Sequence, residues 1–402
     1  MVSLEDIEAA RRLLQGILEP TPLVRSDYFS KLLRSEVYFK LENMQRTGSF
    51  KVRGAFAKIA SLSEEERRRG VIASSAGNHA QGVALASTSY HIPVVIVMPE
   101  TASLPKVTST RDYGAEVVLH GRTYDEAYAY ARKIQRQRGL TFIHPFDDWK
   151  IMAGQGTVGL EIVESLPDFD VVVVPVGGGG LIAGVATAIK SLRPGVRIIG
   201  VQSENVNSCF RSFKTGHIEE SPTGETIADG IAVRKCGRLA FSVIRRLVDD
   251  MVVVGDDAIV HAVVALLEWS KLVVEPAGAV GLAAMLAGNL LLPGKRVVIV
   301  LSGGNIDPSL LARLIEHGLT AAGRYLIVRA RLLDRPGQLM RLVSILAQER
   351  VNIMDIEHHR AGVPMAINQA EVELTLEVRD PKHCAQIMEA LQGAGFEVWR
   401  EW

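Results

Sequence analysis

The chain has 402 residues, which is enough for two or three domains with a large buried core. Its 45 basic and 45 acidic side chains balance, which disfavours nucleic acid or an anionic membrane as the partner. Aromatic residues make up only 6% of the chain, whereas small and aliphatic residues are plentiful, as is typical of parallel α/β enzymes.

Three cysteines lie far apart and form no Cys-x-x-Cys pair: Cys209, Cys236 and Cys384. This pattern is typical of a reducing cytosol, so we expect neither a disulfide framework nor a zinc knuckle. The N-terminus lacks a signal-peptide core. An uncharged run over residues 171–189 is interrupted by Pro175 and four glycines, which predicts a strand, a loop and a helix. We therefore expect a soluble, cytoplasmic protein.

Apolar runs alternate with helical patterns through the first three quarters of the chain. Strands are predicted at residues 71–73, 94–98, 117–119, 171–174, 198–201 and 297–301. Helical patterns lie between them, for example at residues 80–89, 124–137 and 181–192. This alternation predicts doubly wound βαβ architecture, in which ligands bind at the carboxyl ends of the strands.

Lys51 lies among small residues, directly after the aromatic ring of Phe50 and within the segment Gly-Ser-Phe-Lys-Val-Arg-Gly. A lysine that is kept away from water can attack the carbonyl carbon of a cofactor, because its neutral amine is a nucleophile. Most lysines between a glycine and an arginine are surface charges, so the segment alone does not establish a catalytic role.

A polar segment follows the strand predicted at residues 71–73 and opens a helix. Hydroxyl, carboxamide and backbone N–H groups at a helix N-terminus can bind a carboxylate. The residues that would form this cradle are Ser75, Ala76, Gly77, Asn78 and His79. An ordinary capped turn between a strand and a helix explains the segment equally well.

Four glycines and a leucine follow the buried strand predicted at residues 171–174: Gly177, Gly178, Gly179, Gly180 and Leu181. Consecutive glycines let backbone N–H groups converge on an anion, and the following helix adds its dipole. The loop lacks the Lys-Ser/Thr of a nucleotide P-loop and the spacing of a dinucleotide fingerprint. A small phosphate monoester therefore suits it better than ATP or NAD, and a flexible turn is the alternative.

Two further loops complete the pattern. Residues 226–230 form a small-residue loop that could wall a pocket, and Ser302 follows the strand predicted at residues 297–301, where its hydroxyl could face a ring nitrogen. Pyridoxal 5′-phosphate needs a lysine for its aldehyde, a phosphate site, a donor for its phenolic oxygen and a partner for its ring nitrogen. Lys51, the glycine loop, Asn78 and Ser302 could supply these four groups in turn.

On these motifs, together with Lys40-Leu41-Glu42-Asn43, the sequence resembles the fold-type II pyridoxal-phosphate enzymes, and among them the threonine/serine dehydratases. The resemblance covers about residues 1–320 and implies two doubly wound open-sheet subdomains, the smaller at about residues 45–150. It implies Lys51 as the lysine that binds the cofactor and Phe50 beside the ring. It also implies Asn78 at the phenolic oxygen, residues 177–181 at the phosphate and Ser302 at the pyridine nitrogen.

The implied reaction is a β-elimination that converts L-threonine to 2-oxobutanoate and ammonia, with L-serine as a second substrate. Lys51 would take the Cα proton, and a neutral Ser302 beside the ring nitrogen favours elimination over transamination. A serine-preferring dehydratase and a serine racemase are the alternatives. Related racemases carry a serine where this chain has Ala76, which cannot transfer a proton. Their metal-binding carboxylates correspond to Gln202 and Ser208, so we expect no metal site.

A second module is predicted at residues 324–402. Strands at residues 325–331, 351–359, 371–379 and 396–399 alternate with helices at residues 338–348 and 381–393 in the βαββαβ order of a ferredoxin-like module. Its Asp-Arg-Pro-Gly turn resembles that of the ACT regulatory domain. This resemblance implies an amino-acid effector, such as isoleucine or valine, at Asp334, Pro336 and Gly337.

Fold relatives imply a homodimer or homotetramer, and no nucleic acid or membrane is expected as a partner. An ACT domain that only assists oligomerisation is one alternative for the second module. A non-catalytic amino-acid sensor is a second alternative for the whole chain, although the intact Lys51 and Ser302 argue against it. Isoleucine biosynthesis and threonine catabolism use the same chemistry, so the sequence leaves both roles open.

Overall fold

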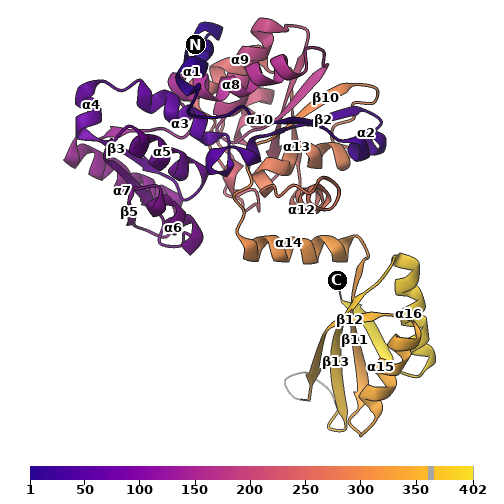
Figure 1. The fold of residues 1–402 in the computed structure, drawn as a ribbon. Coiled ribbons are helices and arrows are strands. Elements are labelled where there is room, and N and C mark those ends of the chain that lie inside the picture. Colours follow the sequence, from indigo (N-terminus) through magenta and orange to yellow (C-terminus); the bar gives the residue numbers. More distant parts are fainter. Residues whose placement is uncertain (361–365, 402) are drawn as a thin grey trace. The chain divides into compact units, whose positions relative to one another are not determined.

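The computed structural model describes residues 1–360 and 366–401, and the chain divides into two compact units, Met1–Asp307 and Pro308–Trp402 (Figure 1). The first unit contains a six-stranded and a four-stranded sheet, and the second contains one four-stranded sheet. In the part of the chain that is described, no helix is long and apolar enough to cross a membrane.

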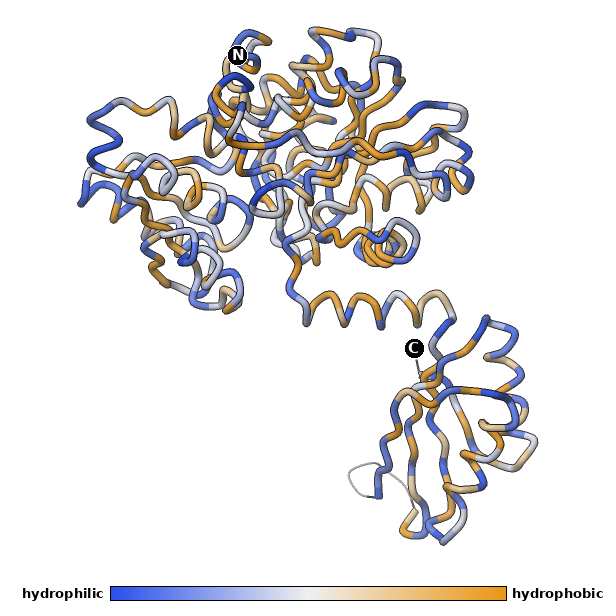
Figure 2. Tube along the Cα trace, viewed as in Figure 1, coloured by the Kyte–Doolittle hydropathy of each residue, from blue (hydrophilic) through white to orange (hydrophobic). Residues whose placement is uncertain are grey.

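The six-stranded sheet has the order β1-β2-β10-β7-β8-β9 and is parallel except for the pairing of β1 with β2. Its strands are β1 (Leu23–Arg25), β2 (Glu36–Leu41), β7 (Val171–Pro175), β8 (Arg197–Ser203), β9 (Asp250–Val254) and β10 (Arg296–Leu301). The central strands β7 and β10 are runs of aliphatic residues, which lie at the hydrophobic end of the colour scale in Figure 2. Nearly all of their residues are buried, as in parallel strands that helices cover on both faces.

Helices connect these strands: α1 (Leu4–Leu14), α2 (Asp27–Leu33), α8 (Trp149–Ser165), α9 (Gly180–Leu192), α10 (Ser208–Thr215), α11 (Arg238–Leu247), α12 (Asp256–Ala265) and α13 (Pro276–Leu286). Short turns of 3-10 or π type are η1 (Glu42–Met44), η2 (Arg46–Gly48), η3 (Asp229–Ile231) and η4 (Leu266–Ser270). Local capping fixes several helix ends; at the start of α8, for example, the Asp148 carboxylate accepts the N–H groups of Lys150 and Ile151.

The four-stranded sheet of the first unit has the order β5-β4-β3-β6 and is parallel throughout. It consists of β3 (Val71–Ser74), β4 (Val94–Met98), β5 (Glu116–Leu119) and β6 (Thr141–Phe142), with helices α3 (Lys51–Ala60), α4 (Glu64–Arg69), α5 (Asn78–Ser89), α6 (Leu104–Asp112) and α7 (Tyr124–Arg138). The predicted doubly wound architecture and the six predicted strands are confirmed within two residues at each end. Strands β1, β2, β6 and β9 were not predicted, and β1 and β6 have only three and two residues.

The second unit begins with α14 (Pro308–Ala321) and continues with β11 (Tyr325–Leu333), α15 (Gln338–Gln348), β12 (Asn352–His359), β13 (Gln369–Glu377), α16 (Pro381–Gly393) and β14 (Glu397–Glu401). The antiparallel sheet has the order β12-β13-β11-β14. Alternate residues of β11 are buried, because one face of the sheet packs against the two helices. The predicted βαββαβ order is confirmed.

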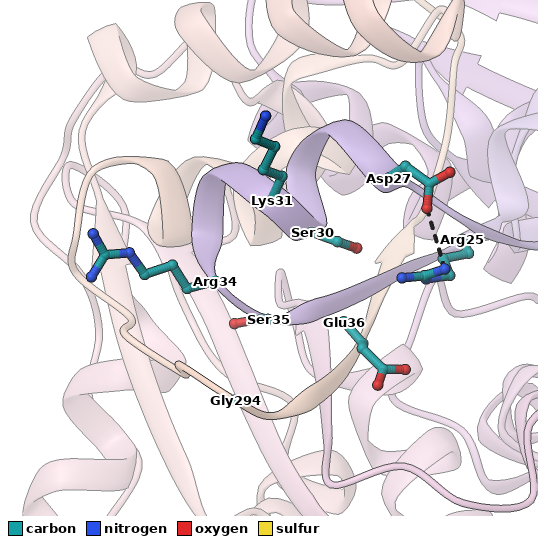
Figure 3. Close-up of a pocket in the computed structure, with 8 residues that line it drawn as sticks. All are labelled: Arg25, Asp27, Ser30, Lys31, Arg34, Ser35, Glu36 and Gly294. Carbon is teal, nitrogen blue, oxygen red and sulfur yellow. Dashed lines mark ion pairs between the residues drawn. The ribbon is translucent and has the colours of Figure 1, made fainter.

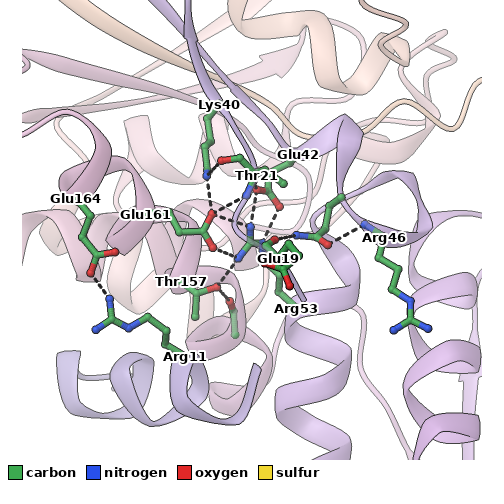
Figure 4. A network of polar contacts seen from close by, with 12 residues as sticks. Arg11, Glu19, Thr21, Lys40, Glu42, Arg46, Arg53, Thr157, Glu161 and Glu164 are labelled. Atoms are coloured by element: carbon green, nitrogen blue, oxygen red, sulfur yellow. Dashed lines mark hydrogen bonds and ion pairs between the residues drawn. The ribbon is translucent and has the colours of Figure 1, made fainter. Parts of the chain in front are cut away.

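A buried network of charged side chains joins β2, α3 and α8 in the first unit (Figure 4). Arg53 in α3 is 2% exposed, and its guanidinium donates to both carboxylate oxygens of Glu42 at 2.8 Å. It also donates to Glu161 in α8, with Nη1 2.5 Å from Oε1 and Nη2 2.9 Å from Oε2. Lys40 in β2 donates to the same carboxylate, with Nζ 2.5 Å from Oε2.

The four groups of this network compensate one another, since two are positive and two are negative. Burial by itself would raise the pKa of Glu42, but the Arg53 guanidinium lowers it overall. The carboxylates of Glu42 and Glu161 likewise raise the pKa of Arg53 in spite of its burial. Glu42 and Arg53 therefore stay ionised, and the network ties α3 to the six-stranded sheet and to α8.

Arg53→Met should lower the free energy of unfolding of the first unit by about 3–5 kcal/mol, because the buried carboxylate of Glu42 loses its cationic partner and that of Glu161 keeps only Lys40. Urea unfolding followed by circular dichroism measures this change. The matched control is Arg69→Met, which removes an exposed i,i+4 pair with Glu65 (3.4 Å) and should change stability by less than about 0.5 kcal/mol. Equal losses in the two variants would contradict the role assigned to the network.

Candidate active site

A cavity of about 1160 Å³ opens in the first unit at the carboxyl ends of β3, β7 and β10. Parallel sheets place ligand sites at this edge. The cavity is lined by every residue that the sequence predicted for the cofactor and the substrate: Phe50, Lys51, Ser75, Ala76, Gly77, Asn78, His79, Gly177, Gly178, Gly179, Gly180, Leu181 and Ser302. The loop at residues 226–230 contributes Asp229 and Gly230, whereas Thr226 Oγ1 donates to Asp256 (2.6 Å).

Lys51 is the first residue of α3, and the end of β10 holds the segment before it. The N–H of Phe50 donates to the carbonyl of Ser302 (3.1 Å). The amine of Lys51 donates to the carbonyl of Pro145, with Nζ 3.0 Å from the oxygen and 5.2 Å from the centroid of the Phe50 ring. Burial lowers the pKa of Lys51 to about 8, although the carboxylate of Glu275 acts in the opposite direction. At pH 7 about a tenth of the Lys51 amine is therefore neutral and nucleophilic, far more than for an exposed lysine.

The glycine loop follows β7, and no larger residues fit there. A Cβ on Gly178 would lie 2.3 Å from the ring of Phe146, and one on Gly180 would lie 2.8 Å from its carbonyl oxygen. Gly179 has a φ of +98°, a left-handed conformation that favours glycine. The N–H groups of the first turn of α9 have no acceptor within their helix. Bare backbone at a helix N-terminus fits a phosphate group.

Phe146 lies against the glycine loop, and hydrogen bonds of neighbouring residues hold it in place. His144 Nδ1 accepts the N–H of Asp147 at 2.8 Å, and burial lowers the pKa of His144. The carboxylate of Asp147 accepts N–H groups at the start of α11, including that of Leu239 at 2.8 Å. Asp147, the neighbour of Phe146, thus caps α11, a helix of the six-stranded sheet. This contact sets the position of Phe146 over the glycine loop.

The segment after β3 presents the N-terminus of α5 to the cavity. Ser75 Oγ accepts the N–H of Gly77 at 3.2 Å, which closes a tight turn before Asn78. His79 is 4% exposed, and burial, followed by the charge of Lys51, lowers its pKa to about 3. The neutral ring donates from Nε2 to the carbonyl of Ile143 (3.0 Å), so His79 anchors the segment by this contact.

Two residues to which the sequence assigned no role contact Asn78: Glu275, which lies in none of the predicted motifs, and Asn305, which ends the motif that begins at Ser302. Asn78 Nδ2 donates to Glu275 Oε1 at 2.7 Å, and Asn78 Oδ1 accepts from Asn305 Nδ2 at 2.7 Å. Burial and then the carboxylate of Asp229 raise the pKa of Glu275 to about 8. In the sequence, Glu275 precedes Pro276 at a helix start and resembles an ordinary capping residue, so no local signal distinguishes it.

One expectation from the sequence was wrong: Cys209 and Cys236 form a disulfide. They are 27 residues apart, and the first turn of α10 and the segment before α11 bring their Cα atoms to 5.0 Å behind the glycine loop. Sequence spacing does not report such a contact. Gln202 and Ser208 bond to protein groups: Gln202 accepts the N–H of Phe210 (2.7 Å) and Ser208 donates to the carbonyl of Val233 (2.6 Å).

A second, shallower hollow of about 410 Å³ lies near the start of β2 (Figure 3). Its polar lining includes Arg25 and Asp27, which form an ion pair (3.3 Å), and Glu36, which pairs with Arg296 (3.1 Å). Glu36 begins β2 and Gly294 precedes β10, so this hollow lies at the amino ends of parallel strands. Ligand sites of open α/β sheets lie at the opposite edge.

Gly178→Ala should weaken the binding of pyridoxal phosphate by about tenfold or more, since the added methyl group overlaps the Phe146 ring. Equilibrium titration of the apoprotein with the cofactor measures the change. Gly195→Ala is the matched control, because nothing lies within 4 Å of its added Cβ. The double variant Gly178→Ala/Phe146→Leu should recover part of the affinity; no recovery would contradict the proposed overlap.

The chain matches two protein families. Residues 14–303 match the pyridoxal-phosphate dependent enzymes, and residues 326–394 match the ACT domain. The chain is 50% identical over 398 residues to an L-threonine ammonia-lyase of Thermotoga maritima, and 99% of each chain is covered.

Solved structures agree with these matches. The chain is similar to threonine deaminase isoform 2 of Solanum lycopersicum, with a TM-score of 0.75, 40% identity and coverage of 78% of this chain and 92% of that one. Maize serine racemase has the same TM-score, 35% identity and coverage of 80% and 98%. The chain therefore belongs to the threonine ammonia-lyase family of pyridoxal-phosphate dependent enzymes and carries a C-terminal ACT domain.

Proposed function

We propose that this chain converts L-threonine to 2-oxobutanoate and ammonia by β-elimination and also acts on L-serine. The observation that carries the proposal is the convergence of Lys51, the glycine loop, Asn78 and Ser302 on one cavity. The relative from Thermotoga maritima, which matches along nearly its full length, is named for the same activity.

The lining of the cavity fits pyridoxal phosphate. The glycine loop and the first turn of α9 would hold the phosphate, because a side chain there would fill the cradle. Asn78 would donate to the phenolic oxygen, Phe50 would lie beside the ring and the hydroxyl of Ser302 would face the ring nitrogen. When bound, the cofactor supplies an electron sink for the charge left on the substrate Cα.

Lys51 is the group that would move the proton. Its free amine, with a pKa lowered to about 8 by burial, can accept the Cα proton of a bound amino acid near neutral pH. The bond from Nζ to the carbonyl of Pro145 holds this amine in the cavity. Removal of the Cα proton leaves negative charge on Cα, and loss of the substrate hydroxyl takes up this charge. Elimination is therefore favoured over transamination.

The N-terminus of α5 would bind the substrate carboxylate. Backbone N–H groups at this helix start, together with the hydroxyl of Ser75, offer donors for an anion next to Gly77. Ala76 and His79 would complete the segment, His79 as a neutral anchor. Ala76 presents a methyl group, so it cannot return a proton to the second face of Cα as racemisation requires.

In the second unit, the turn after β11 would bind an amino-acid effector. Gly337 has a φ of +88° and caps α15, and Asp334 Oδ1 lies 3.3 Å from Arg360 Nε. With Pro336 between them, this turn offers the backbone N–H of Gly337 and the carboxylate of Asp334 for the zwitterion of an amino acid. The match to the ACT domain supports regulation through this unit.

The proposal includes a homodimer or homotetramer in the cytoplasm. The stacked rings of Tyr28 and Trp269 lie 4.1 Å apart and remain 38% and 49% exposed, which leaves apolar surface that a second copy would cover. The functional domain boundary proposed for the ACT domain is residue 324, at the start of its first strand.

Lys51→Ala should abolish 2-oxobutanoate formation from L-threonine and the visible absorption of the bound cofactor, because the variant lacks both the covalent anchor and the base. A keto-acid assay and an absorption spectrum measure the two effects. Lys58→Ala, a change in the same helix outside the cavity, is the matched control. D-serine formed from L-serine as fast as pyruvate would instead favour the racemase.

Isoleucine or valine should change kcat/KM for threonine or the oligomeric state, because a ligand of the ACT unit binds its alternative states unequally. Steady-state kinetics and light scattering, run with each proteinogenic amino acid, measure the response. Lysine, which lacks a branched apolar side chain, is the control ligand. The same kinetics with every amino acid would count against effector binding.

A further inference from the structure

We propose that Glu275 is a positioning residue for the proposed reaction: its carboxylate, with Asn305, holds the carboxamide of Asn78 in the one orientation that presents an N–H group to the cofactor. This inference rests on the proposed function in one respect, that Asn78 faces the phenolic oxygen of pyridoxal phosphate. Glu275 lies in none of the motifs predicted from the sequence.

The hydrogen bonds of Asn78 leave no freedom for its amide. Asn305 Nδ2 donates to the backbone carbonyl of Thr47 (2.6 Å), which identifies that atom as the nitrogen. Asn78 Oδ1 accepts from the same nitrogen at 2.7 Å, so Asn78 Nδ2 must face Glu275 Oε1, also at 2.7 Å. A flipped amide would set two donors against each other at Asn305 and, while Glu275 is ionised, two acceptors at Glu275.

This arrangement leaves the second hydrogen of Asn78 Nδ2 for the cavity. A primary amide has two N–H donors, and Glu275 takes one of them. The phenolic oxygen of the cofactor needs a donor, whereas a flipped Asn78 would offer it an acceptor. Glu275 therefore makes Asn78 a hydrogen-bond donor to the cofactor, although Glu275 itself does not lie at the reacting atoms.

The backbone around Glu275 is built for this contact. Glu275 is 5% exposed and directly precedes α13, and its N–H donates to the carbonyl of Gly303 (3.0 Å). A Cβ on Gly303 would lie 2.3 Å from Glu275 Oε1 and 3.1 Å from Asn78 Nδ2. The glycine after Ser302 is thus required by the Glu275–Asn78 hydrogen bond that passes over it.

Glu275 also acts on its neighbours through its charge. The groups that face it electrostatically are the carboxylate of Asp229, the ammonium of Lys106, the amine of Lys51 and the amide of Asn78. Its carboxylate raises the pKa of Lys51, in opposition to burial. Charge and hydrogen bonding can be separated, since Glu275→Gln keeps an acceptor and loses the charge, whereas Glu275→Leu loses both.

The first test is the equilibrium affinity of the apoprotein for pyridoxal phosphate, measured by absorbance titration. We expect Glu275→Leu to weaken binding by about tenfold, the size of a lost hydrogen bond to a buried polar group, and Glu275→Gln to restore most of it. Glu64→Leu, an exposed position on α4, is the matched control. A glutamine variant as weak as the leucine variant overturns the proposal.

A double-variant cycle separates positioning from simple packing. If Glu275 acts through Asn78, the variant Glu275→Leu/Asn78→Ala binds the cofactor no more weakly than Asn78→Ala alone. Losses that multiply in the double variant overturn the proposal. Circular dichroism melts of each apoprotein establish folding, and Glu275→Asp, whose shorter side chain withdraws from Asn78, replaces the leucine variant if that variant does not fold.

The second test is the pH dependence of cofactor incorporation by the apoprotein, which follows the neutral amine of Lys51. Both Glu275→Gln and Glu275→Leu should move its midpoint to lower pH, because each removes the charge that raises the Lys51 pKa. An unchanged midpoint in both variants contradicts the placement of the carboxylate near Lys51. A wild type that forms no keto acid from threonine refutes the proposed function, while the cofactor affinities still decide the role of Glu275.

Discussion

The buried ion network around Arg53 is the constraint on which the active site depends. Arg53 lies in the first turn of α3, the helix that begins with Lys51, and its guanidinium is fixed by carboxylates from η1 and α8. The position of Lys51, at the start of the same helix, is therefore set by the four buried charged side chains of this network. Replacing such a network with apolar residues often preserves stability, but removing one partner strands the others. In this protein the network matters for geometry, because it holds the start of α3 in one position.

The cavity combines groups from two sheets. The small sheet contributes the N-terminus of α5 after β3, and the large sheet contributes the glycine loop after β7 and Ser302 after β10. These three groups are uncharged or backbone-based, whereas Lys51 and Glu275 in the same cavity can carry a charge. Burial lowers the pKa of Lys51 and raises that of Glu275, both to about 8, so burial disfavours the charged form of each group and both groups titrate near pH 8. A neutral amine is the form that proton transfer and carbonyl chemistry require.

Much of the fold and most of the site residues could be predicted from local sequence. The strands β4, β7 and β10 are continuous aliphatic runs whose limits are marked by glycine, proline or polar residues, and each was predicted within one residue. Strands β1 and β6 were not, because two or three residues carry no periodic pattern. The disulfide between Cys209 and Cys236 was also missed, since contact across 27 residues leaves no mark in their spacing.

The sequence by itself determined the chemistry on offer: a lysine next to a phenylalanine, a carboxamide at a helix start, a run of glycines and a serine after a strand. Each is a local pattern whose meaning comes from neighbours in the chain. Only the tertiary structure decided the pKa values and the orientations of these groups. The pKa of Lys51, the orientation of Asn78 and the importance of Glu275 arise from residues about 200 to 230 positions away in the chain. Burial and hydrogen bonding act through space, so they are fixed only when the sheets bring those residues together.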